Sequence, residues 1–181
     1  MASAHLDQNR QQPAPAAHSS TLFQQAMRQL TGGVTLVTTN HEGINIGLTA
    51  TAVCSLSAAP PRLLTCVNAR GATYRALSAS RRMCVNILAV DHCDLARRFA
   101  GMTDRGDADM FAMGDWSLSA DAPPRLVDAL ASFDCEIDMI METTSHGVVI
   151  GDIKEIVVGA GRPSLLYGNG QFQIPNDIVA G

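Results

Sequence analysis

The chain has 181 residues, of which 46% are hydrophobic and 17% are charged, and its formal net charge is −4. This length suits one domain with a sizeable core and is too short for two comfortable ones. The scattered basic residues give no stripe for a phosphate backbone, and no apolar run reaches the roughly 18 residues of a membrane span. We therefore expect a cytoplasmic protein with no nucleic-acid or membrane partner.

The N-terminal segment divides into a tail and a helix. Residues 1–18 are rich in Gln, Pro and Ala, which predicts a flexible tail before a single domain over residues 19–181. A capping cluster at residues 19–21 then precedes apolar residues at helical spacing, namely Leu22, Phe23, Ala26, Met27 and Leu30. Because these end before a Gly-Gly pair, the pattern predicts an amphipathic helix.

From Val34 onward, short β-branched runs separated by Gly, Pro and Asn predict a mainly β fold. The expected strands are Val34–Thr39, Gly47–Val53, Leu63–Val67, Met83–Leu88, Phe133–Glu142, Val148–Val158 and Ser164–Tyr167. The fifth alternates most clearly, with the apolar Phe133, Cys135, Ile137, Met139 and Met141 between Asp134, Glu136 and Asp138. It predicts one core face and one solvated acidic face.

Three short helices are expected between the strands, at Ala72–Ser80, Asp91–Ala100 and Pro124–Ser132. The second begins with a capping Asp, and the third has proline near its first turn. The stretch Gly101–Asp121, with the single Trp, is interpreted as a long loop. Loops of that length in a compact domain are usually functional or shared with a partner subunit.

The cysteines and histidines give no metal signal. Five cysteines without a CxxC pair, mostly inside apolar runs, indicate buried free thiols and no metal site. We assign His5, His18, His41 and His92 to the surface.

A run of small and hydroxyl side chains is the first candidate binding segment. A flat heteroaromatic ligand could lie close to such a backbone and bond to its N–H groups. An ordinary strand and turn, whose hydroxyls satisfy local backbone groups, is the alternative. The candidate residues are Thr49, Ala50, Thr51, Ala52, Val53, Cys54, Ser55 and Ser57.

The second candidate lies where a strand runs through glycine into a short helix. Asn68, Arg70 and Thr73 occupy this junction. Backbone N–H groups at a helix start favour phosphate, and arginine can add a bidentate contact. Arg70 could equally be a solvated turn residue.

Seven short segments, found in order over roughly residues 20–172, closely resemble the flavin reductase family. That family includes the reductase components of two-component flavin monooxygenases. The segments are TATAVCSLSAAPPRLLTCVN, VNIL, LARRFAG, FAMGDW, ALASFDCEI, SHGVVIGDI and LLYGNGQF. The resemblance implies a six-stranded antiparallel Greek-key split barrel with short flanking α-helices, assembled as a homodimer with flavin near the subunit interface.

The resemblance also implies a role for each matching residue. Residues 49–57 would line the isoalloxazine and ribityl chain, while Asn68, Arg70 and Thr73 would hold the phosphate end. Arg98 and Phe99 would close over the flavin. His146 would face the nicotinamide as the catalytic residue, and Tyr167 falls in the family's final Leu-Leu-Tyr.

Three departures from the family pattern concern charge and spacing. The usual Gly-Thr-His is replaced by Thr144-Ser145-His146, and Asp-Arg-Phe by Asp109-Met110-Phe111. The basic residues expected after Leu-Leu-Tyr are replaced by Gly168-Asn169-Gly170. These changes leave open how the phosphates of the dinucleotide are held.

The implied activity is an NAD(P)H-dependent flavin reductase that passes a hydride from NADH or NADPH to FMN or FAD. The reduced flavin would supply a partner monooxygenase. Two alternatives remain at this stage. One is a flavin-dependent reductase of a bound acceptor such as a corrinoid cobalt centre. The other is a flavin-binding electron-carrier module without its own NAD(P)H turnover.

Overall fold

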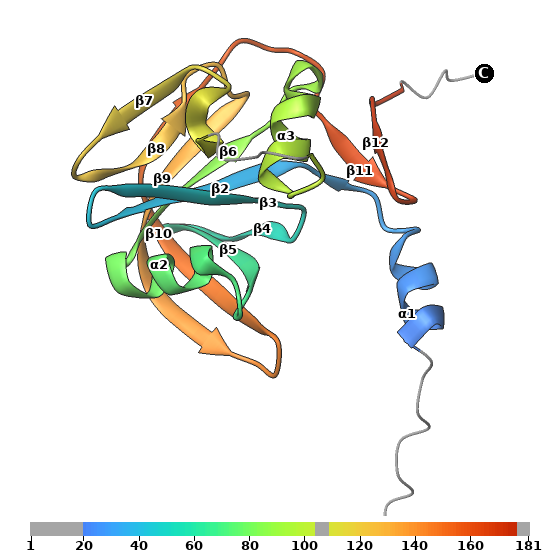
Figure 1. The fold of residues 1–181 in the computed structure, drawn as a ribbon, viewed down its shortest axis with the longest axis horizontal. Helices are drawn as coiled ribbons and strands as arrows, with labels where there is room; N and C mark the ends of the chain where they lie inside the picture. The colour runs from blue at the N-terminus through green and yellow to red at the C-terminus, as the bar shows by residue number, and fades with distance from the viewer. Residues whose placement is uncertain (1–19, 104–108, 177–181) are drawn as a thin grey trace, which may run out of the picture.

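A computed structural model describes residues 20–103 and 109–176, and they fold around a seven-stranded antiparallel sheet (Figure 1). The strand order is β3-β2-β6-β9-β10-β5-β4. The bounds are β2 (Thr35–His41), β3 (Ile44–Ala50), β4 (Val53–Ala58), β5 (Pro61–Asn68), β6 (Arg82–Ile87), β9 (Ala131–Glu142) and β10 (His146–Val158). The predicted mainly β, antiparallel class is confirmed, although this sheet has seven strands where six were expected.

The two edges of this sheet meet at one point of the chain. Strands β3 and β4 lie at opposite ends of the strand order, yet only Thr51 and Ala52 separate them. Three Cα steps span at most roughly 11 Å, so the edges must lie close together there. The sheet is therefore rolled into a barrel that is split between β3 and β4. We call the Thr51–Ala52 connection the seam.

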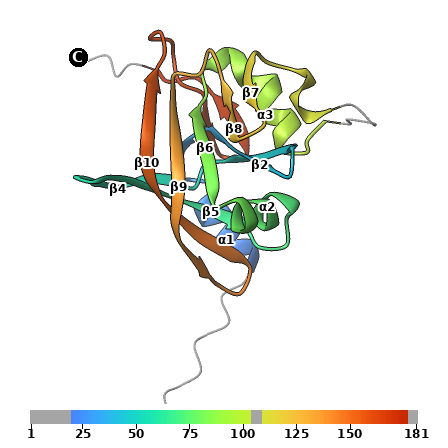
Figure 2. The same ribbon diagram turned by 90° about the vertical axis from the view of Figure 1, so that its left-hand side faces the viewer.

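Two buried apolar clusters fill the fold. The first includes Val37, Leu63, Leu77, Met83 and Val149, and it joins the sheet to α2 (Ala72–Ser80). The second includes Val34, Leu36, Leu88, Leu95 and Phe99, and it joins the sheet to α3 (Cys93–Phe99), which follows the single turn η1 (Val90–His92). In Figures 1 and 2 the two helices lie on different parts of the barrel, α2 below β2 and β3 and α3 above them. Both helices thus pack against β2 and β3, and β3 is the strand that precedes the seam.

Smaller elements surround the barrel. A three-stranded sheet pairs β1 (Gly32–Gly33), β11 (Leu166–Gly168) and β12 (Gln171–Gln173), and a ribbon pairs β7 (Trp116–Ser119) with β8 (Ala122–Leu126). Helix α1 (Ser20–Met27) is the predicted N-terminal helix, and none of its residues is buried. Figure 1 shows it standing at the side of the barrel below β11 and β12. The predicted tail, residues 1–18, lies outside the described residues.

Three sequence-based assignments were wrong. The expected helix Pro124–Ser132 is strand β8, a turn and the start of β9. The Pro124 carbonyl accepts from the Thr38 hydroxyl at 2.5 Å, and prolines are tolerated in such a short ribbon. The expected strand Gly47–Val53 is broken at the seam, and the expected loop Gly101–Asp121 contains β7 and the single turn η2 (Met110–Ala112).

The alternation of β9 fails beyond its middle because of a bulge. Ile137 pairs with Gly151, but Met139 pairs with Ile150, so Asp138 is an extra residue that reverses the two faces. Met139 and Met141 are consequently exposed, while Ile140 packs against the core. Glu136 and Asp138 are exposed, as expected, and form ion pairs with Lys154 and Arg62, whereas Asp134 is largely buried beside Arg125, so the expectation of a solvated acidic face was wrong there.

The cysteines are free, but they are not all buried. Burial raises the pKa of the Cys84 thiol and raises that of Cys135 to about 12, in keeping with inert core residues. Cys54 on β4 is exposed, so the expectation of buried thiols was wrong there. His92 is also not a surface residue, because it is only 8% exposed and its Nε2 lies 3.1 Å from Asp128.

Candidate functional site

The seam and the first half of β4 form an exposed wall of small side chains. Thr51, Ala52, Cys54 and Ser55 are exposed, and Val53 is half-buried. Because β4 is an edge strand, one of its two rows of backbone groups has no partner strand. The Cys66 N–H donates to the Ala52 carbonyl at 3.0 Å, so the alternating ladder turns the Val53 and Ser55 N–H groups away from β5.

In the candidate segment 49–57, some side chains form hydrogen bonds within the fold and others are left available to a ligand. The Thr49 hydroxyl donates to the Ala96 carbonyl at 2.7 Å, and the Ser57 hydroxyl donates to the Pro60 carbonyl. Ala50 is buried, at 8% exposed. Within the described ranges, the Thr51 and Ser55 hydroxyls form no hydrogen bond, so these two keep donors and acceptors for a ligand.

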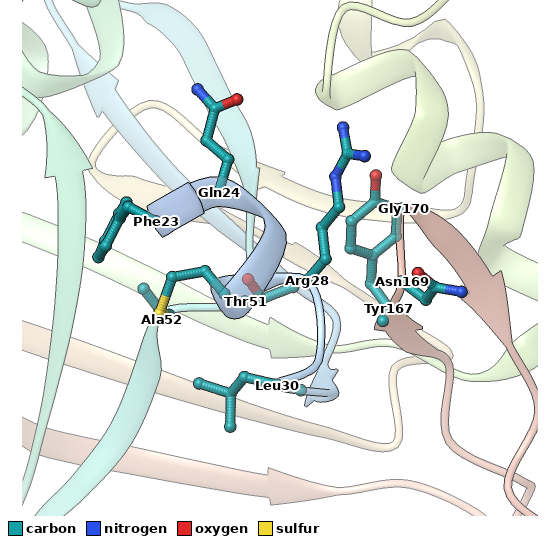
Figure 3. A pocket seen from close by; sticks show the side chains of 12 residues that line it. Phe23, Gln24, Arg28, Leu30, Thr51, Ala52, Tyr167, Asn169 and Gly170 are labelled. Carbon is teal, nitrogen blue, oxygen red and sulfur yellow. The ribbon is translucent and has the colours of Figure 1, made fainter. Parts of the chain in front are cut away.

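A cavity of about 540 Å³ opens beside the seam (Figure 3). Helix α1 forms one side and the β11–β12 turn the other, with Thr51 and Ala52 at its edge. A smaller hollow of about 170 Å³ shares Thr51 and Tyr167 with it. Tyr167 thus lies beside the wall, and the volume of the larger cavity falls within the range of small-molecule sites.

A third hollow, of about 530 Å³, lies along β4. Val53, Cys54, Ser55 and Ser57 line it together with the apolar Phe133 and Ile153. The wall therefore borders two hollows. The seam adjoins the one beside α1 and Tyr167, and β4 adjoins the one beside the inner strands of the barrel.

The predicted phosphate-binding junction is only partly available. The Thr73 hydroxyl is buried and donates to the Gly47 carbonyl at 3.2 Å, so it joins α2 to β3. Asn68 Oδ1 accepts from the Arg70 N–H at 2.9 Å, which shapes the turn. Helix α2 has no side-chain cap and no acidic residue in its first turn, and the Arg70 guanidinium has no hydrogen-bond or ion-pair partner among the residues described. An anion could use both.

His146 lies two strands away from β4, at the end of the barrel that carries the seam. It pairs with Asn68 across β10 and β5, and β5 pairs with β4. Asn68 lies two residues beyond Cys66, whose N–H bonds to Ala52, so two strand spacings of about 4.8 Å and two residues of about 3.3 Å place the histidine backbone roughly 12 Å from the seam. The side chain is exposed, and its Nδ1 lies 2.9 Å from the Ser145 hydroxyl. His146 is therefore free to contact a ligand that lies over this end of the barrel, without losing any contact within the core.

Tyr74 positions the hairpin that carries His146, a role that sequence reasoning missed. A Cβ at Gly147 would lie 2.3 Å from the Tyr74 ring, so only glycine lets β10 pass there. The Tyr74 hydroxyl donates to Glu142 at 3.0 Å, and burial together with that carboxylate raises the pKa of Tyr74. The glycine immediately after the histidine was the available signal.

Arg98 and Phe99 are not free to close over a ligand at the seam. The Arg98 Nε donates to the Met110 carbonyl at 3.2 Å, and Phe99 is 5% exposed. The Phe99 ring packs edge-on against Phe111, with centroids 5.2 Å apart, and lies 5.6 Å from that of Trp116. These two residues hold α3 to η2 and β7.

The described ranges contain no group of three or more His, Cys, Asp or Glu side chains that could hold a metal ion. None of the helices in them is both long and apolar enough to cross a membrane.

The comparisons with known proteins agree with one another. The family profile described as "Flavin reductase like domain" matches residues 27–175. A protein of Ancylobacter novellus named "FMN reductase (NADH) RutF" is 39% identical over 166 residues, which cover 91% of each chain. A Methylorubrum extorquens protein named "FMN reductase (NADH) RutF 2" is 38% identical over 160 residues, or 88% of this chain and 92% of that one.

Solved structures show the same likeness in three dimensions. A flavin reductase domain protein from Arthrobacter sp. FB24 superposes with a TM-score of 0.80 at 29% identity, covering 88% of this chain and 98% of that one. The Streptomyces globisporus NADH:FAD oxidoreductase SgcE6, in complex with NAD and FAD fragments, gives 0.78 at 26% identity, covering 88% and 94%.

Proposed function

Because this chain belongs to the flavin reductase family, we propose that it transfers a hydride from a reduced nicotinamide dinucleotide to FMN or FAD. The relatives of Ancylobacter and Methylorubrum are named NADH-dependent FMN reductases, which favours NADH and FMN. The SgcE6 structure, with NAD and FAD fragments, supports the same pair of ligand classes. An NAD(P)H-dependent flavin reductase is thus the assignment that the family and the site support together.

The observation that carries this proposal is the exposed wall at the seam. A flat ring needs a surface without bulky side chains, and Thr51, Ala52 and Ser55 supply one. The outward N–H groups of Val53 and Ser55 and the two uncommitted hydroxyls suit the polar edge of a flavin. Arg70 and the uncapped start of α2 suit its phosphate. The residues present therefore fit a flavin.

The bound flavin would supply the hydride acceptor, and the protein would supply geometry and electrostatics. The Val53 and Ser55 N–H groups would stabilise negative charge on the edge of the ring, because fixed donors need no reorganisation during the reaction. His146 would orient the nicotinamide and exclude water beside it. No protein nucleophile takes part.

We extend the proposal to the assembly and to the role in the cell. Helix α1 exposes Leu22 and Phe23 to 60% and 63%, and β4 exposes Leu56 to 45%, so apolar surface near the site lacks cover. A homodimer with residues 19–181 as its single folded domain would cover it, with the 101–121 segment at or near the interface. The reduced flavin would pass to a flavin-dependent monooxygenase in the cytoplasm.

One assay tests the activity. The purified chain is mixed with NADH and FMN, and absorbance at 340 nm is followed under air, with NADPH and FAD as the alternative pair. We expect NADH to be consumed at a rate proportional to protein concentration and dependent on flavin. Flavin binding without NADH or NADPH consumption would instead support the electron-carrier module and overturn the proposal.

A further inference from the structure

The β11–β12 turn lies where the family resemblance expects basic residues. Here the turn is Gly168-Asn169-Gly170, with positive φ angles of 50° at Asn169 and 76° at Gly170. The Asn169 N–H donates to the carbonyl of Arg28 at 2.6 Å, just after the end of α1. An arginine from a different part of the chain is thus held beside the turn that has lost its own cations.

The side chain of Arg28 has the features of an anion ligand. It lines the 540 Å³ cavity, and in Figure 3 it projects from the turn just after α1 toward Tyr167 and Gly170. Among the described residues that line the cavity it is the only charged one, and it forms no hydrogen bond or ion pair with another described side chain. A guanidinium without a carboxylate partner suits a phosphate, to which it can bond with two N–H groups at once.

We propose that this cavity binds a phosphate group of a nucleotide through Arg28, and that the group belongs to the pyrophosphate of the nicotinamide dinucleotide. The inference rests on the proposed function. Arg70 and the start of α2, on the β5 side of the seam, already offer a place for the flavin phosphate. The Arg28 cavity touches the seam at Thr51 and Ala52 from the side of α1, so it offers the pyrophosphate of a dinucleotide stacked on the flavin ring a separate place.

The test compares hydride donors with and without phosphate. Rates are measured at saturating FMN for NADH and for N-benzyl-1,4-dihydronicotinamide, which has no phosphate. In Arg28→Ala we expect KM for NADH to rise about tenfold, while kcat/KM for the benzyl compound stays within about twofold. Arg28→Lys should recover part of the loss, because the charge remains. Gln25→Ala, on the neighbouring helix α1 but outside the cavity, is the matched control.

A second arm identifies the source of the phosphate. Fluorescence titration compares FMN with riboflavin, which lacks the phosphate, and Arg28→Ala should bind both as the wild type does. Weaker FMN binding with unchanged riboflavin binding would assign the cavity to the flavin phosphate and overturn the dinucleotide assignment. An equal loss with both hydride donors would show a structural effect of α1 and would also overturn it. Failure of the proposed function is a separate result, seen as a wild-type protein that consumes no NADH.

Discussion

The seam and the aromatic cluster of Phe99, Phe111 and Trp116 both match family segments, yet the structure uses them differently. In the aromatic cluster the rings pack against one another, and Phe99 is 5% exposed. The guanidinium of the neighbouring Arg98 donates to the Met110 carbonyl. At the seam, Thr51 and Ala52 are exposed and the Thr51 hydroxyl has no partner within the described ranges. A motif match therefore marks positions the fold depends on as well as positions available to a ligand.

The difference has a cause in topology. The aromatic cluster lies under α3, where buried apolar area stabilises the fold. The seam lies where two sheet edges meet, so its backbone has hydrogen-bonding groups without partner strands. Substitutions in the first region should lower stability, and substitutions in the second should lower ligand affinity or rate.

The largest effect is expected from Phe99→Ala. Removing a buried ring that touches two other aromatic residues should cost about 3–5 kcal/mol of unfolding free energy. Urea unfolding followed by circular dichroism measures it. Phe99→Leu, which keeps much of the volume, should cost clearly less. If Phe99→Ala unfolds like the wild type but loses FMN affinity, Phe99 contacts the ligand, and the contrast between the aromatic cluster and the seam is wrong.

The second effect concerns the wall. Ala52→Phe should block close approach of the flavin ring and weaken FMN binding by about a hundredfold, or about 2.7 kcal/mol. The melting temperature of the flavin-free protein should change little, because Ala52 is exposed. Fluorescence titration and thermal unfolding measure the two quantities, with Ala79→Phe on the exposed side of α2 as control. A variant that loses stability and keeps its FMN affinity would mark this segment as ordinary strand and turn.

His146→Ala should affect the rate alone. We expect kcat/KM for NADH to fall about tenfold, which is about 1.4 kcal/mol of transition-state stabilisation, with FMN affinity within about twofold. Stopped-flow reduction of bound FMN measures the first, and His41→Ala is the matched surface control. A wild-type rate in the variant would give His146 a purely structural role next to Ser145.

A smaller effect, on stability, is expected at Thr49, in the candidate segment 49–57. Thr49→Val removes the hydroxyl that donates to the Ala96 carbonyl and should cost about 1 kcal/mol of stability. FMN affinity should stay within about twofold. Thr49→Ser keeps the hydroxyl and should recover most of the loss. A large fall in FMN affinity with unchanged stability would place Thr49 in the site.

Thiol labelling sharpens the contrast without any mutation. Cys54 on the wall is exposed, while burial raises the pKa of the Cys84 and Cys135 thiols. Iodoacetamide at neutral pH should modify Cys54 well before these two, and FMN should slow the modification of Cys54. Mass spectrometry of timed samples reports each site. Labelling of Cys54 that FMN does not change would argue against a ring on the wall.

The sequence predicted the strands better than it predicted their interruptions. Alternation located β9, but the bulge at Asp138, which reverses its faces, depends on pairing with Gly151 in β10. The Pro-rich start of β8 was misinterpreted as helix because its hydrogen bond to Thr38 joins residues far apart in the sequence. Both contacts join residues that are distant in the sequence, so the pattern of neighbouring residues could not reveal them.

The sequence located the segment of the candidate site, but it did not show which of its side chains bond within the fold and which remain available to a ligand. The sequence predicted the run from Thr49 to Ser57 as one binding segment, and only the hydrogen bonds of Thr49 and Ser57 in the fold distinguish those two from Thr51 and Ser55. Arg28 gave no signal at all, since a single arginine on an amphipathic helix is ordinary. Its significance depends on the β11–β12 turn, which lies about 140 residues further along the chain and beside it only in the fold.

Hydrogen exchange at the wall tests the central claim most directly, because that claim concerns particular backbone N–H groups. Exchange of the amides of Val53 and Ser55 is followed by mass spectrometry or NMR, with and without FMN. We predict that FMN slows exchange at these two positions and leaves the amides around Phe99 and Phe111 unchanged. Unchanged exchange at Val53 and Ser55 under saturating FMN, with protection elsewhere, would contradict the account.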